Sequence, residues 1–195
     1  MSRRRARARP KGRMRAMADL WRQTHWIFRA LFLGLALLLL FMRLLPLNHA
    51  PGALPGPDLV ICLILAWFVR RPVFLPMPLI AGVILLEDLI LMLPPGLWTA
   101  IVVLATEFLR SRIILTRELN FVVEWMLVSG VMLGMMLTYR IALGLAFVPQ
   151  PPFGFAIVQV LWSIGLYPLV VGLSRLIFDL RKPAMGEVDD FGRRL

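Results

Sequence analysis

Long apolar segments recur along the chain, and short connections rich in proline, glycine or charge separate them. A helix that crosses a bilayer needs about 20 mainly apolar residues, or fewer when it is tilted or paired. Six segments approach that length, and the second to fourth are short: 27–45, 59–69, 79–93, 97–109 with a continuation to 115, 121–147 and 155–178. The pattern predicts an all-α fold, a six-helix transmembrane bundle in a polytopic integral membrane protein.

The composition points the same way. Hydrophobic residues make up 59% of the 195 residues, and the mean hydropathy is +0.79, which is too apolar for a soluble globule. The first apolar segment is longer than the core of a signal peptide and lacks a small-residue cleavage pattern, so it should remain as an anchor. The predicted organisation is a basic cytoplasmic tail (1–26), a transmembrane helical domain (27–178) and a second cytoplasmic tail (179–195).

The net charge of +11 is distributed unevenly. Almost half of the 22 lysines and arginines precede residue 30, and most of the others follow apolar segments, whereas the connections 48–58, 94–96 and 148–154 contain none. Because basic residues mark cytoplasmic loops, both termini are predicted to be cytoplasmic. An arginine-rich tail beside a span favours anionic lipid over nucleic acid as its ligand. The basic residues expected at the membrane surface are Arg3, Arg4, Arg5, Arg70 and Arg71.

Two adjacent carboxylates, Glu87 and Asp88, interrupt the third apolar segment. A charge inside a bilayer costs about 2.5–3.5 kcal/mol on insertion scales, so it should face the bundle interior, be protonated or be paired. Consecutive helical residues point about 100° apart, so the two cannot share one neighbour. Asp88 lies roughly 14 Å along the segment from Leu79, near the expected midplane, and is predicted to be the inward contact. Glu87 has no predicted partner.

Other polar residues of the spans have simpler explanations. Glu107 precedes Arg110 by three residues, and Glu124 lies near Arg117, so both pairs are expected at the interface. We expect Arg43 to extend towards the outer headgroups and Arg140, which lies deeper, to have an acidic partner in the bundle.

Aromatic residues also indicate where spans end, and small residues indicate where two helices could pack closely. Trp67, Trp98 and Tyr167 are near predicted span ends, where aromatic rings anchor in the headgroup region. Gly130 and Gly134 form a small-xxx-small pair that permits close helix approach.

Two functional classes remain for the intramembrane carboxylates. In the first, Asp88 is a polar staple that hydrogen-bonds another helix of a noncatalytic scaffold. In the second, the chain is a transporter or substrate-binding subunit in which Asp88 and Glu107 line a solvent-reaching cavity. An enzyme is disfavoured, because His25 and His49 are far apart and no metal-binding, nucleophile or phosphate-loop motif occurs. No cofactor is expected.

Short motifs occur in a fixed order through nearly the whole chain after about residue 20. They are PDL (57–59), AWxxRRP ending at Pro72, PLIAGxxLLxD ending at Asp88, PPGLW (94–98), EFLRSR (107–112), EW (124–125), PQPP (149–152), YP (167–168) and GEVDxxGRRL (186–195). In this order they resemble the bacterial rod shape-determining MreD family. Asp88 matches the family pattern, whereas Glu87 and the arginine-rich start depart from it.

The resemblance implies a function that composition and spacing do not supply. MreD-like proteins are small multi-pass proteins of the cell inner membrane that bind MreC. Through the elongation machinery they associate with the MreB filament, RodA and a class B penicillin-binding transpeptidase that makes peptidoglycan. They are not known to catalyse a reaction. The family's helices are thought to be arranged like the membrane substrate-binding subunit of energy-coupling-factor transporters, which keeps a ligand pocket open as an alternative.

Overall fold

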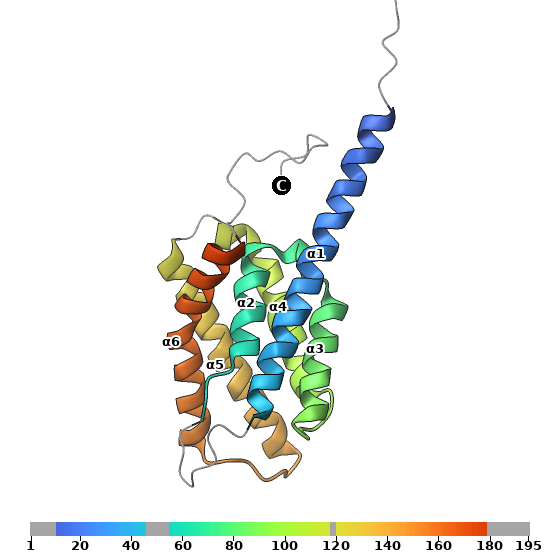
Figure 1. Cartoon of the computed structure of the whole chain (residues 1–195). Coiled ribbons are helices and arrows are strands. Elements are labelled where there is room, and N and C mark those ends of the chain that lie inside the picture. The colour runs from blue at the N-terminus through green and yellow to red at the C-terminus, as the bar shows by residue number, and fades with distance from the viewer. Residues whose placement is uncertain (1–10, 46–54, 118–119, 179–195) are drawn as a thin grey trace, which may run out of the picture.

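The computed structural model describes residues 11–45, 55–117 and 120–178, with the side chains of 11–24 and 113–117 left out (Figure 1). The described part of the chain is all-helical, as predicted. It contains α1 (Lys11–Leu44), α2 (Leu59–Arg70), a 3-10 turn (η1, Pro72–Phe74), α3 (Met77–Ile90), α4 (Leu97–Arg117), α5 (Phe121–Leu145) and α6 (Phe153–Phe178). The two predicted tails fall mostly outside this description, as do Arg3, Arg4 and Arg5.

The helices form a bundle in which successive helices run in opposite directions (Figure 1). Helix α1 begins beyond the upper end of the bundle and α6 ends at that upper end, whereas the α3–α4 turn and the α5–α6 connection lie at the lower end. Helix α2 packs against α1, α4 and α6, while α3 packs against α1 and α4, and α5 against α4 and α6. The second helix of the chain is therefore the central one.

Helix α2 is short and is enclosed by the other helices. Every residue from Val60 to Arg70 is buried, so the helix presents no face to lipid or water. Its 12 residues span only about 18 Å. Asp58 caps its first turn by accepting a hydrogen bond from the Ile61 amide at 3.1 Å. Non-helical backbone at membrane depth is tolerated where protein surrounds it, so a short buried helix with irregular flanks is compatible with a membrane bundle.

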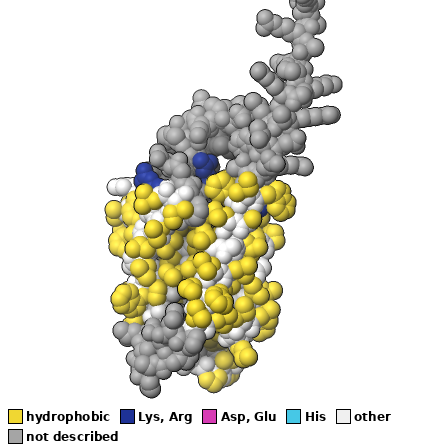
Figure 2. Space-filling model, in the orientation of Figure 1, with side chains coloured by type: hydrophobic (Ala, Val, Ile, Leu, Met, Phe, Trp, Pro, Cys, Tyr) yellow, Lys and Arg dark blue, Asp and Glu magenta, His cyan; other side chains and the backbone are white. Residues whose placement is uncertain are grey.

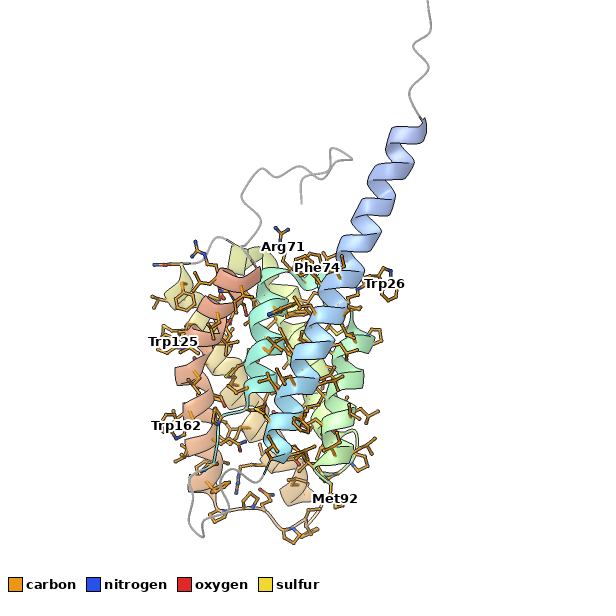
Figure 3. All side chains as sticks on the ribbon, viewed as in Figure 1. Trp26, Arg71, Phe74, Met92, Trp125 and Trp162 are labelled. Atoms are coloured by element: carbon orange, nitrogen blue, oxygen red, sulfur yellow. The ribbon has the colours of Figure 1, made fainter. Side chains whose placement is uncertain are left out.

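Three helices are long and apolar enough to cross a membrane: His25–Leu44, Phe121–Leu145 and Phe153–Ile177. Figure 2 shows that side chains on the visible face of the described bundle are mainly hydrophobic, with Lys and Arg only at its upper end. The exposed side chains include Trp26 and Trp162, labelled in Figure 3. These features are consistent with a membrane protein.

The helix boundaries differ from the predicted ones most clearly at the start of α1 and the end of α3. Helix α1 begins at Lys11, so one continuous helix crosses the predicted boundary between the tail and the first span at residue 26. Helix α3 ends at Ile90 rather than continuing to 93, because Pro94 and Pro95 follow and the chain turns at Gly96, whose φ of 88° suits glycine. The predicted tight hairpin between the third and fourth helices is present, with its turn beginning earlier.

Candidate functional site

An ionic cluster joins three segments at the lower end of the bundle. The Arg43 guanidinium, in the last turn of α1, contacts the Glu87 carboxylate of α3 and lies 3.4 Å from Asp58 Oδ2. Asp58 also reaches α6, since its backbone amide donates to Ser163 Oγ at 2.8 Å. Arg43 thus ties α1 to α2 and α3, and the expectation that it extends to the outer headgroups is wrong. Two acidic partners attract its guanidinium towards the bundle instead.

Glu87, for which the sequence offered no partner, is among the most buried charged residues, with 1% exposure. Its Oε1 contacts Arg43, whereas Oε2 is buried without a hydrogen-bond partner. Glu87 and Asp88 do have different partners, as their 100° separation predicts. The assignment of Asp88 alone as the inward contact is wrong, because both side chains are buried.

Asp88 binds the turn of its own helical hairpin. Its Oδ2 accepts hydrogen bonds from the Gly96 amide at 3.0 Å, the Thr99 amide at 3.3 Å and Thr99 Oγ1 at 2.8 Å. These donors belong to the start of α4, where helical amides lack partners within the helix. Asp88 lies two residues before the end of α3, so it sits beside the turn and not midway along the bundle, where the sequence placed it. It holds α3 to α4.

This role predicts unequal effects of two substitutions. Asp88→Asn keeps an oxygen acceptor for Gly96 and Thr99, so it should lower the free energy of unfolding by about 1 kcal/mol. Asp88→Leu leaves those donors unsatisfied and should lower it by about 1–3 kcal/mol. Chemical unfolding of the purified chain in mixed micelles measures both. Equal losses in the two variants would mean that the hydrogen bonds to Asp88 are not what stabilises the hairpin.

A second ionic cluster lies at the other end of α2. The Arg70 Nη1 atom is 3.2 Å from Glu124 Oε1 of α5, and the Tyr167 hydroxyl of α6 donates to the same oxygen at 3.2 Å. The exposed fractions of the Arg70 and Glu124 side chains are 7% and 1%. Arg70 is therefore not a surface residue, and Tyr167 is not a headgroup anchor. Arg70 is a partner of Glu124 that the sequence did not predict. The side chain of Arg117, the predicted partner, lies outside the described residues.

The remaining predicted residues are dispersed. Glu107 and Arg110 form the expected exposed pair, with 3.7 Å between Oε2 and Nε. Arg71 is partly buried at the upper end, where Figure 3 labels it. Arg140 donates to the Pro151 carbonyl at 3.0 Å and lies over the Phe153 ring. Within the described part of the chain it makes no ion pair, which corrects the expected acidic partner, because the nearby connection supplies carbonyl oxygen and an aromatic face instead.

Two of the three predicted aromatic anchors lie inside the protein. Tyr167 is fully buried, and Trp67 is also fully buried, with its indole donating to Ser174 Oγ at 3.2 Å. Trp98 is half-buried and packs edge-on against Tyr139 at 5.3 Å between ring centroids. Trp67 and Trp98 lie near helix ends, as the sequence indicated, whereas Tyr167 lies in the middle part of α6. Neighbouring helices supply hydrogen-bond acceptors for the two buried rings, Ser174 for Trp67 and Glu124 for Tyr167.

Gly130 and Gly134 do not support a close helix contact within the described bundle. Both are exposed, and a Cβ atom built on either would have no neighbour within 4 Å. They line a shallow groove between α4 and α5 together with Ala105 and Leu104. The two glycines therefore line an open surface groove, and no helix of the described bundle packs closely against them as predicted.

A cavity of about 420 Å³ lies at the lower end of the bundle beside the Arg43 cluster. Arg43, Asp58 and Glu87 line it, with apolar walls from α4, α5, α6 and the connection before α6. Met92, labelled at the lower end in Figure 3, also lines it. Asp88 and Glu107, expected to line a transporter cavity, do not. No group of three or more metal-binding side chains occurs among the described residues.

The roles of Asp58 and Ser163, and the contact of Tyr167 with Glu124, were not predicted from the sequence. Asp58 could have been found, because an aspartate directly before an apolar run is a helix-start signal. The contacts of Ser163 and Tyr167 depend on which helices become neighbours, which no local pattern specifies.

Comparison with known proteins adds no relative, since no family model, curated protein or solved structure matches the chain.

Proposed function

We propose that the chain is a noncatalytic membrane scaffold of the MreD type. In this role it binds MreC and, through it, the peptidoglycan-synthesising elongation machinery that maintains rod shape. The ordered motifs from PDL at 57–59 to YP at 167–168 support the family, and the all-helical bundle with an apolar exterior suits a protein that presents helix surfaces to partners in a bilayer.

The observation that carries the proposal is that the buried carboxylates contact other helices or a helix turn. Glu87 contacts Arg43, Asp88 binds the α3–α4 turn, and Glu124 pairs with Arg70. Each contact connects different helices or closes a hairpin, and the clusters lie at opposite ends of α2. A proton or ion relay needs groups in succession along one path. The arrangement therefore favours structural joints that fix helix positions.

The proposed topology has six spans with both ends of the chain on the cytoplasmic side. The three shorter helices reach across because α2 is enclosed by protein and because α3 and α4 continue into one hairpin. Reporter fusions after Asn48 and Gln150 should signal the outer side, and fusions after Arg71 and Arg194 the inside. Reversed signals at either pair would contradict the six-span topology.

A cellular experiment tests the scaffold. In a rod-shaped bacterium depleted of its own MreD, the chain expressed with its cognate MreC should restore rods and co-purify with MreC. Asp88→Asn should retain both properties, whereas Asp88→Leu, which disturbs the α3–α4 hairpin, should weaken them. The scaffold proposal fails if wild-type chain accumulates in the membrane yet neither restores shape nor retains MreC.

The cavity favours a second candidate, a membrane transporter or substrate-binding subunit for a small molecule or lipid-linked precursor. Its distinguishing property is transport. Reconstituted with its energising partner, such a protein would accumulate ligand inside vesicles, whereas a scaffold would not.

A further inference from the structure

The cavity at the lower end has the composition of a small-molecule site. Its walls are mainly apolar and include three methionines of α5, Met132, Met135 and Met136. Two aromatic rings, Trp98 and Tyr139, line it from α4 and α5. Its volume of about 420 Å³ lies in the range of ligand pockets, which combine apolar walls with a few placed polar groups. The apolar part of a ligand would contact these side chains.

The polar part of the cavity has an excess of acceptors. Within the Arg43 cluster, one guanidinium faces the two carboxylates of Asp58 and Glu87. The other cation that lines the cavity, Arg140, contacts the Pro151 carbonyl and the Phe153 ring instead of these carboxylates. Glu87 has 1% exposure and lines the cavity, and its Oε2 has no hydrogen-bond donor. A buried acceptor without a partner costs about 1–3 kcal/mol, or more when charged, so a donor supplied by a ligand would be strongly favoured there.

Three other polar side chains that line the cavity have partners. Ser163 Oγ donates to the Gln159 carbonyl at 2.9 Å and accepts from the Asp58 amide. Gln150 Nε2 donates to the Arg140 carbonyl at 2.9 Å. The Arg140 guanidinium donates to Pro151 and lies over Phe153. Among the described residues, Glu87 is the lining side chain with a buried polar atom that has no hydrogen-bond partner.

We propose that this cavity binds a protonated amine carried on an apolar or aromatic body. The ammonium group would pair with the Glu87 carboxylate, which lines the cavity, and balance the second carboxylate of the Arg43 cluster. The aromatic rings of Trp98 and Tyr139 and the methionines line the cavity and would contact the apolar body of the ligand. The amine can belong to a free small molecule or to the headgroup of phosphatidylethanolamine. The inference goes beyond the scaffold role and does not depend on MreC.

Calorimetric titration of the purified full chain in phosphatidylglycerol nanodiscs tests the charge requirement without any variant. The probes are 2-phenylethylamine, the uncharged 2-phenylethanol and the anionic 3-phenylpropanoate. We expect saturable binding of the amine, at least tenfold weaker binding of the alcohol, and none of the acid. No saturable amine binding, or an alcohol or acid that binds as tightly, would overturn the proposal.

Variants then locate the binding. Glu87→Gln should weaken amine binding at least tenfold, and Glu107→Gln, which alters an exposed carboxylate outside the cavity, should not change it. Met136→Trp reduces the cavity from α5 and should also weaken binding tenfold. Met126→Trp, on the same helix but 67% exposed, is its matched control. Equal losses in the cavity and control variants would place the amine elsewhere and overturn the assignment.

The lipid composition of the nanodiscs separates the two sources of amine. If phosphatidylethanolamine occupies the cavity, nanodiscs that contain it should weaken the binding of 2-phenylethylamine relative to pure phosphatidylglycerol. Unchanged binding assigns the cavity to a free amine. Both results support an amine site. Failure of the chain to restore rod shape, or to co-purify with MreC, would contradict only the scaffold proposal.

Discussion

Replacing Glu124 by leucine should destabilise the bundle by about 3–5 kcal/mol, the cost of leaving one partner of a buried ion pair uncompensated. Leucine nearly preserves the side-chain volume but leaves the Arg70 guanidinium, whose side chain is only 7% exposed, without its carboxylate. The Tyr167 hydroxyl loses the same acceptor. Equilibrium unfolding of the purified chain in mixed micelles gives the free-energy change.

Two controls make the Glu124 result specific. Glu107→Leu removes an exposed carboxylate paired across one turn of helix, so it should cost no more than about 1 kcal/mol. The double variant Arg70→Met/Glu124→Leu removes both charges and should recover most of the stability, because well-packed apolar side chains often replace a buried pair without loss. A single variant as stable as wild type would contradict the buried pair.

Arg43→Met should lower the free energy of unfolding more than Glu87→Leu, because Arg43 is the one cation that pairs with both Asp58 and Glu87 in its cluster. Without Arg43 both Glu87 and Asp58 lose their cation, whereas without Glu87 the guanidinium retains Asp58 at 3.4 Å. We expect a loss of about 2–4 kcal/mol for Arg43→Met, below the full cost of breaking a buried pair because 32% of the Arg43 side chain is exposed. Glu87→Leu should cost about half as much.

The matched control for Arg43 is Arg140→Met. Arg140 also lies near the lower end, but it contacts a carbonyl oxygen and an aromatic ring instead of carboxylates. Its loss should lower the free energy of unfolding by about 1 kcal/mol. If Arg140→Met proved as damaging as Arg43→Met, the Arg43 cluster would not be the connection that joins α1 to α2 and α3.

The helices were predictable because their signals are local. Apolar runs of sufficient length, interrupted by proline, glycine and arginine, place six helices within a few residues, and Pro94-Pro95-Gly96 places a turn. The start of α1 at Lys11 was missed because the polar, arginine-rich stretch before residue 27 has no apolar run to mark it.

The partners of the charged residues were not predictable in the same way. The sequence shows that placing Glu87, Asp88 and Glu124 inside a bilayer costs free energy unless each is paired or hydrogen-bonded. It also shows the i,i+3 pair of Glu107 with Arg110. It cannot show that α2 is central, which is what brings Arg70 to Glu124 and buries Trp67. Arg43 and Glu87 are 44 residues apart, and their contact follows from how α1 packs on α3.

The scaffold proposal makes the bundle a binding surface for MreC, and binding between purified components tests it most directly. The full chain and its cognate MreC, each purified in the same mild detergent and then mixed, should form a complex that elutes together on size exclusion and persists in high salt. Asp88→Leu should weaken that complex. Separate elution of MreC from folded wild-type chain would contradict the account.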